Sequence, residues 1–335
     1  MAHDLEQMNG ETAFALRGAP AWHGLANVLF DQSADISTAE MLKSAKLNDW
    51  NIRLEDVIIP ADYRTTTDQF MVVRNNPFDG GKDILAIVGD RYSTFQNEEL
   101  FSFGDNLLEG GGRWESAGSI KQGRQVFGSL EIDRQMVLDP KGVADKTKTY
   151  LVLFTSHDGS SSIHALITPV RVVCQNTLNM AIKGSKQSFK VRHTQKADGR
   201  IAEARRVLGL TFDHMDKFED LAKDLFATKI TNQQFDDLFT ALYPAPDQAQ
   251  KSAFTRYEAK QDLTRALYLS SPTQAGITGT AWGALNALTE RIDWFRDGGK
   301  GQTEGLLASA SGFEAGVNSE KARILSAVKE LAGVN

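Results

Sequence analysis

Residues 149–173 read TYLVLFTSHDGSSSIHALITPVRVV, and this stretch decides the expected fold. It consists of two apolar, β-rich runs on either side of the segment His157-Asp158-Gly159-Ser160. An Asp-Gly turn between alternating apolar runs is one of the better short-range signals for a β-hairpin. The stretch therefore predicts two consecutive antiparallel strands.

Similar strand signals dominate the chain before this hairpin. Short β-rich runs separated by turn residues occupy 50–60, 68–74 and 83–89, and residues 112–133 read as another hairpin around Lys121-Gln122-Gly123. One helix is expected at 97–110, where apolar residues recur at helical spacing and Gly110 can end it. Ser37 is expected to cap a short helix before these strands. The pattern predicts a mostly antiparallel meander.

After Cys174 the strand signals nearly stop, apart from a run at 188–194. Helical periodicity follows at 201–225, 232–242, 249–269, 279–299 and 319–333. Strands first and helices afterwards indicate the α+β class: an antiparallel β-meander with hairpins in the N-terminal half, then a mostly helical C-terminal half. We divide the chain into an extended N-terminal segment, 1–35, an α+β domain, 36–198, and a helical region, 199–335, that packs on the domain or mediates self-association.

Bulk properties place the chain among globular proteins. It has 335 residues, 41% of them hydrophobic and 24% charged. No apolar run reaches the 18 or so residues of a membrane span, and the first 18 residues lack the pattern of a secretory signal. One cysteine cannot form an internal disulfide, which favours a reducing compartment. We therefore expect a cytoplasmic protein and no membrane association.

The charge of the chain is unevenly distributed. The net charge is −6, yet residues 141–210 hold 12 Lys and Arg against 4 Asp and Glu. One reading is that acidic and basic parts neutralise each other within the fold or between subunits. The other is a local site for a polyanion, because Lys and Arg release counterions from phosphates.

The positive charge is concentrated at 183–206, which we call the basic segment. Phe189 alternates with basic residues there and could stack on a base. Arg171, shortly before the segment, could belong to the same surface. The residues expected to contact nucleic acid are Arg171, Lys183, Lys186, Phe189, Lys190, Arg192, His193, Lys196, Arg200, Arg205 and Arg206.

Cys174 and the histidines are the other candidates for chemistry. Cys174 lies where a strand gives way to a helix, but no cysteine-enzyme signature surrounds it, and a free cysteine is commonly a small core residue. His157 and His164 flank the hairpin turn and could approach each other, yet a zinc site would need further ligands. We interpret these histidines as surface or polar-network residues and assign no metal, no cofactor and no catalytic residue.

Several stretches together resemble a known family. They are AWHGLAN at 21–27, TPVRVVCQNTLNMA at 168–181, VRHT at 191–194, EARRVLGL at 203–210 and TAWGALNALTERIDWFR at 280–296. This order resembles a phage/plasmid-like family of unknown function from actinobacterial phages, prophages and plasmids. The resemblance implies a mobile-element protein and no particular reaction. Its recurring residues correspond here to Trp22, His23, Arg171, Cys174, Asn176, Thr177, His193, Arg205, Trp282 and Asn286, without assigned roles.

A looser analogy concerns shape. The order of hairpin, hairpin and helix from Gly112 to Ile182, followed by the basic segment, is similar to phage single-strand annealing proteins. We therefore expect a phage or plasmid DNA-metabolism protein that binds single-stranded DNA, such as an annealing or recombination protein, works without catalysis and forms a homo-oligomer.

Two alternatives stay open at this point. One is an enzyme acting on nucleotides or nucleic acid at Arg171, Cys174, Asn176 and His193. The other is a non-catalytic phage protein that binds a host factor.

Overall fold

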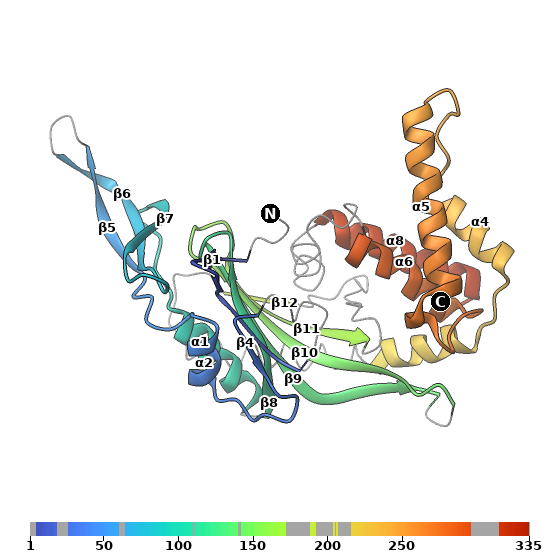
Figure 1. Ribbon diagram of the computed structural model, residues 1–335, viewed down its shortest axis with the longest axis horizontal. Helices are drawn as coiled ribbons and strands as arrows, with labels where there is room; N and C mark the ends of the chain where they lie inside the picture. Colours follow the sequence, from blue (N-terminus) through green and yellow to red (C-terminus); the bar gives the residue numbers. More distant parts are fainter. Residues whose placement is uncertain are drawn as a thin grey trace.

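The computed structural model describes residues 5–18, 26–59, 64–109, 111–139, 142–171, 188–191, 204, 206, 216–295 and 315–334. Strands occupy the N-terminal half and helices the C-terminal half, which confirms the α+β prediction. Figure 1 shows three groups of elements: a three-stranded sheet that projects at one end, a large central sheet, and a group of helices at the other end.

The central sheet has seven strands in the order β12-β11-β10-β9-β8-β3-β4. Four of them run consecutively as an antiparallel meander: β8 (Gly112–Ile120), β9 (Gln125–Leu138), β10 (Asp145–Ser156) and β11 (Ile163–Arg171). β12 (Ser188–Val191) adds antiparallel to β11 at one edge. The hairpin predicted at 149–173 is therefore confirmed as β10 and β11, with residues 157–162 as its turn.

The opposite edge of this sheet comes from the beginning of the chain. β3 (Phe14–Arg17) pairs antiparallel with β8, and β4 (Val28–Phe30) pairs parallel with β3. Two very short strands, β1 (Gln7–Met8) and β2 (Glu11–Thr12), precede them as a separate pair. Part of the segment that we expected to be merely extended thus completes the main sheet.

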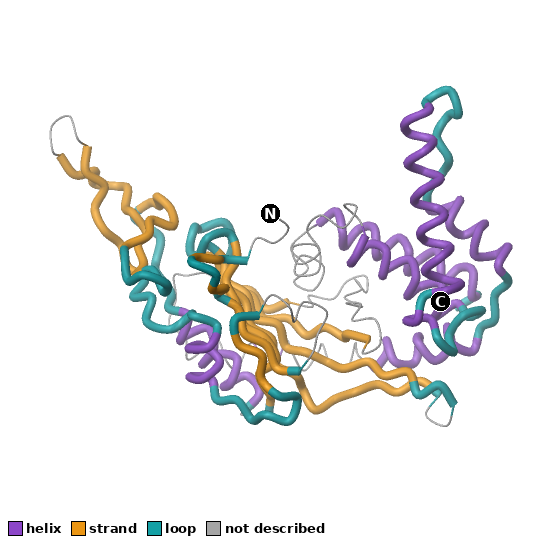
Figure 2. The backbone as a smooth tube through the Cα atoms, viewed as in Figure 1, coloured by secondary structure: helices purple, strands orange, loops and turns teal. Residues whose placement is uncertain are grey.

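Three of the expected strands form a sheet of their own. β5 (Arg53–Ile59), β6 (Arg64–Asn75) and β7 (Lys82–Gly89) pair antiparallel in that order. Figure 2 shows these strands standing apart from the central sheet. Residues 76–81 join β6 to β7, and the helix that follows β7 separates the three strands from β8.

Two helices cover one face of the central sheet. α1 (Thr38–Ser44) begins after Ser37, whose side chain accepts a hydrogen bond from the Glu40 amide, as the sequence predicts. α2 (Asn97–Leu108) ends with Glu109 in the left-handed conformation, before the expected stop at Gly110. Met41 of α1 and Phe101 of α2 share an apolar core with Trp114 of β8, and the Phe101 and Trp114 rings stack at 4.6 Å.

The helical half has its own core. The helical half consists of helical residues 216–227, α4 (Asn232–Leu242), α5 (Lys251–Ser270), a 3-10 turn at Pro272–Gln274, α6 (Ala281–Phe295) and α8 (Ala315–Ala332). α6 is buried along most of its length. Met136 and Leu138, at the end of β9, belong to the same core, and the Trp282 indole donates a hydrogen bond to Asp145 of β10 over 2.9 Å. These contacts join the helical half to the sheet.

Candidate functional site

The structure describes only part of the basic segment. Arg171 is the last residue of β11, Phe189 and Lys190 lie in β12, and Arg206 is helical. The other expected contacts lie outside the described residues: Lys183, Lys186, Arg192, His193, Lys196, Arg200 and Arg205. Cys174 and Asn176, from the alternative enzyme hypothesis, also lie outside them.

The described part of the basic segment supplies the edge strand of the central sheet. In β12, position 190 pairs with His164 of β11 and position 189 pairs with Ala165. β12 is the last strand in the sheet order, so within the described chain its outer edge has no strand partner. The segment with the greatest positive charge in the sequence therefore borders an open edge of the sheet.

The end of the basic segment returns to the same sheet. Ala204 is fully buried and belongs to the apolar core that contains Ile163, Ala165 and Ile167 of β11. Arg206, two residues further, is exposed. Ala204 thus lies in the apolar core of the sheet, and Arg206 lies at the surface.

A cluster of charges surrounds Glu131 on β9. Its carboxylate lies 2.7 Å from the buried Arg17, 2.9 Å from Lys148 and 3.4 Å from Arg113. Burial alone would raise the pKa of Glu131, but hydrogen bonds from Lys148 and Arg17 outweigh it and hold the pKa below its usual value. Three cations therefore share this carboxylate, and Arg113 is 55% exposed.

Arg17 has a structural role in this cluster. Its Nε donates to the carbonyl of Trp114 over 2.8 Å, and a terminal nitrogen donates to the carbonyl of Gln32 over 2.8 Å. The other terminal nitrogen donates to Glu131. Arg17 joins β3 to β8 and β9 in this way, which leaves Lys148 and Arg113 as the cations of the cluster that can meet a ligand.

Glu115 and Tyr150 form a second pair beside Glu131. The Tyr150 hydroxyl donates to the Glu115 carboxylate over 2.8 Å. Burial raises the pKa of Glu115 to about 7; Glu131 adds to the rise, while the hydrogen bond from Tyr150 and the charges of Lys148 and Arg17 oppose it. Near neutral pH part of the Glu115 population is protonated, so the net charge of the surrounding cluster becomes more positive as the pH falls.

The register of β10 and β11 places Lys148 of this cluster beside the end of the strand that carries Arg171, but on the opposite face of the sheet from position 171. Lys148 pairs with position 170, and Thr147 pairs with position 171. Sequence patterns predict the strand that carries Arg171 but not its proximity to Lys148. No local signal reveals this proximity, because it depends on the register of the hairpin.

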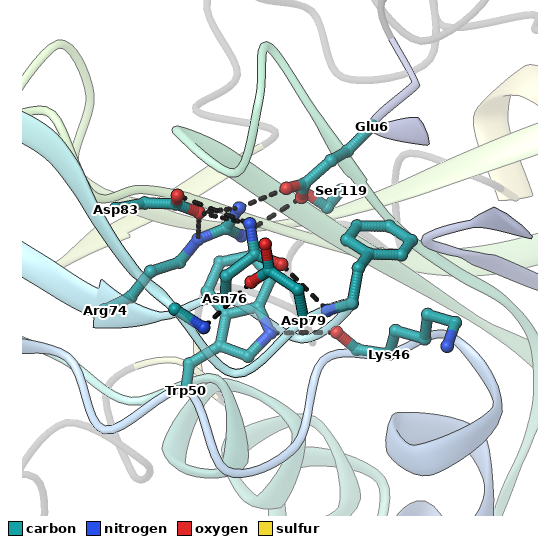
Figure 3. A network of polar contacts seen from close by, with 10 residues as sticks. Glu6, Lys46, Trp50, Arg74, Asn76, Asp79, Asp83 and Ser119 are labelled. Atoms are coloured by element: carbon teal, nitrogen blue, oxygen red, sulfur yellow. Dashed lines mark hydrogen bonds and ion pairs between the residues drawn. The ribbon is translucent and has the colours of Figure 1, made fainter. Parts of the chain in front are cut away.

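The most extensive network of polar contacts described lies elsewhere, around Arg74 of β6 (Figure 3). Arg74 is 1% exposed; its terminal nitrogens bind both carboxylate oxygens of Glu6, and its Nε donates to Asp83 over 3.0 Å. Its guanidinium also lies 4.1 Å from the centre of a Trp50 ring. Ser119 of β8 donates to Glu6 over 2.7 Å. The network holds the three-stranded sheet against the N-terminal segment and β8, and its buried cation is paired with two carboxylates.

The two histidines of the hairpin do not converge. His157 is fully buried, lies 5.8 Å from the Trp50 ring and forms a 2.9 Å hydrogen bond with Asn97. His164 instead contacts the Phe154 ring and lies 3.0 Å from the Ser161 hydroxyl. Both belong to polar networks. Within the described residues, no group of three or more His, Cys, Asp and Glu side chains is arranged to hold a metal ion.

Comparison with known proteins identifies the family. The model for a domain of unknown function, DUF932, matches residues 84–322, which is most of the chain and runs from β7 through the strands β8 to β12 and the helices into α8. The chain therefore belongs to the DUF932 family. No curated protein and no solved structure matches the chain. None of the helices in the described ranges combines the length and apolar character needed to cross a bilayer.

Proposed function

We propose that the protein binds single-stranded DNA through the basic segment and Arg171. The observation that carries this proposal is the position of β12, since it places residues 188–191 of the basic segment at the open edge of the described sheet. Lys and Arg side chains around such an edge would neutralise phosphates, and Phe189 would stack on a base.

The charge cluster on the neighbouring strands supports this assignment. Lys148 is 26% exposed and Arg113 is 55% exposed, so both can add phosphate contacts to those of the basic segment. Position 190, which pairs with His164, lies on the same face of the sheet as Lys148, whereas position 171 lies on the other face, because successive residues of a strand alternate between faces. A strand of DNA along the first face would therefore meet Lys190 and Lys148.

The family membership fits a protein without an assigned reaction, and the proposal includes no catalytic step. We further propose a role in the DNA metabolism of a phage or plasmid, such as strand annealing or recombination, in the cytoplasm of a bacterial host. Self-association along the DNA strand, through the helical half, belongs to the same proposal. The resemblance to phage/plasmid-like proteins and the analogy to single-strand annealing proteins support it.

Fluorescence anisotropy with a labelled single-stranded oligonucleotide tests the binding. A triple variant replaces Lys190, Arg192 and Arg200 with Gln, and a control variant replaces the exposed Lys43, Lys121 and Lys251. Titrations at several salt concentrations should give a steep fall of affinity with salt, and the triple variant should reduce the logarithmic slope by about 2. An absence of binding at low salt, or an equal effect of both triple variants, would contradict the proposal.

A further inference from the structure

A second group of cations surrounds the ring of Tyr243 in the helical half, away from the basic segment. Tyr243 directly follows α4, Lys260 lies on α5, Arg291 on α6, and Arg323 on α8. The Lys260 nitrogen lies 3.3 Å from the ring centre, and the guanidinium carbons of Arg291 and Arg323 lie at 5.1 Å and 5.5 Å. Four chain segments therefore bring three positive charges to one aromatic ring.

Only one carboxylate compensates these charges in the described chain. Glu320 of α8 accepts a hydrogen bond from Tyr243 over 2.6 Å and lies 2.7 Å from Arg291. Among the described residues, neither Lys260 nor Arg323 has a carboxylate at ion-pair distance. With three cations and one anion, the cluster has an excess of two positive charges.

The fully buried cations elsewhere in the described ranges each have a carboxylate partner. Arg17 is paired with Glu131, Arg74 with Glu6 and Asp83, and Lys321 with Asp293. In the Tyr243 cluster, by contrast, the half-buried Lys260 has no carboxylate at ion-pair distance among the described residues. Gathering unpaired cations in a partly buried place is unfavourable, because burial and mutual repulsion add.

The unfavourable electrostatics of the cluster affect two of its side chains. Burial lowers the pKa of Lys260 to about 8, with repulsion from Arg291 and Arg323 in the same direction and Glu320 opposing. The Nε of Arg291, a side chain only 6% exposed, is buried and has no hydrogen-bond partner in the described structure. A buried donor without a partner among the described residues and a lysine whose charged form is disfavoured both favour the binding of an anion at this place.

We propose that the Tyr243 cluster binds a phosphate group. A phosphate dianion would balance the two excess charges and would accept hydrogen bonds from Lys260 and Arg323. Arg323 is exposed and Lys260 is half-buried, so the group can enter from solvent on their side. Glu320 and the Tyr243 hydroxyl hold the Arg291 guanidinium in place behind them. The phosphate could be a free anion or a phosphodiester of nucleic acid, which carries one negative charge and would balance only one of the two excess charges.

Isothermal titration calorimetry of the full-length protein with inorganic phosphate tests the site. Saturable binding is expected, and Lys260→Gln and Arg323→Gln should each weaken it about tenfold or more, since each removes a charge-assisted hydrogen bond. Lys251→Gln is the matched control, because Lys251 is an exposed lysine at the start of the same helix. The Arg323 variant keeps the test valid if Lys260→Gln disturbs folding. The proposal is overturned if phosphate does not saturate, or if all three variants bind it alike.

A competition experiment separates the two sources of phosphate. A short single-stranded oligonucleotide that displaces inorganic phosphate from the wild-type protein identifies a phosphodiester as the ligand. An oligonucleotide that leaves phosphate bound identifies the free anion, and both outcomes uphold the site. The outcome is also independent of the basic segment, because the triple variant at Lys190, Arg192 and Arg200 should bind inorganic phosphate as the wild type does.

Discussion

The ammonium of Lys321 lies 2.6 Å from the carboxylate of Asp293, and neither side chain exposes any surface. The pair joins α8 to α6 inside the helical core. An ion pair removed from water in this way is held by mutual attraction that must offset a large loss of hydration. The contribution of the pair to the free energy of unfolding is therefore measured by removing one partner while the other remains buried.

We expect Lys321→Met to lower the free energy of unfolding by about 3–5 kcal/mol, because it removes the ammonium that contacts the buried Asp293 carboxylate. The double variant Lys321→Met, Asp293→Leu should recover much of this loss, since it removes both charges. Urea unfolding measures each value. Lys329→Met, on the same helix, is the control, and its free energy of unfolding should stay within about 0.5 kcal/mol of the wild-type value. A single variant as stable as the wild type would disprove the role of the pair.

Gly123 allows the turn between β8 and β9 to approach Arg74. Its φ is +81°, and a Cβ atom there would lie 2.1 Å from a terminal nitrogen of Arg74. Gly80 has a similar φ of +74° but open space around it. Gly80→Ala should therefore lower the free energy of unfolding by about 1–2 kcal/mol, because alanine is strained in the left-handed conformation. Gly123→Ala should lower it clearly more, because the added Cβ atom also meets Arg74. Chemical denaturation compares the two variants, and equal losses would show that Arg74 is not tightly enclosed.

Glu115→Gln should change the pH dependence of stability. The pKa of Glu115 rises from 4.5 to about 7 on folding, so the folded state binds the proton more tightly than the unfolded state. This residue therefore makes the wild type less stable as the pH increases from about 4.5 to 7, with no further change above that range. The free energy of unfolding of the variant should equal that of the wild type near pH 4 and exceed it by about 1–3 kcal/mol at pH 8. Urea unfolding across pH checks this, and a pH-independent difference would refute it.

Trp282 and Trp294 of α6 offer a matched pair for testing the contact between the two halves. The Trp282 indole donates to Asp145 of β10, whereas the Trp294 indole has no hydrogen-bond partner among the described residues. Trp282→Phe should cost about 1–3 kcal/mol for the lost bond to a buried carboxylate, and Trp294→Phe less than about 1 kcal/mol. Thermal or urea unfolding measures both. Similar losses would mean that the indole bond does not stabilise the junction.

Elements with local signals could be predicted from the sequence. α4 occupies 232–242 as expected, because Thr231 and Gln234 form a capping box and two prolines follow its end. The hairpins around Gly123 and Gly159 follow from their turn residues. In each case the determining residues lie within a few positions of one another.

The pairing of distant strands could not be predicted in the same way. The strands β5, β6 and β7 were expected in the right places, but no local pattern shows that they form a separate sheet. The addition of β3 to β8 depends on pairs such as Phe14 with Gly118, about a hundred residues apart. The clusters around Glu131 and Tyr243 also arise from contacts between distant elements, so the sequence pattern that revealed the basic segment did not reveal them.

The position of β3 has a consequence for folding during synthesis. Its antiparallel partner β8 begins at Gly112, and the carboxylate that pairs with Arg17 lies at Glu131. The hairpins from β8 to β11 can form from neighbouring residues, whereas β3 must wait for a long loop to close. The N-terminal strand is therefore translated early but incorporated late. Until Glu131 has left the ribosome, Arg17 has no buried counter-charge, and the sheet is completed at the edge that was made first.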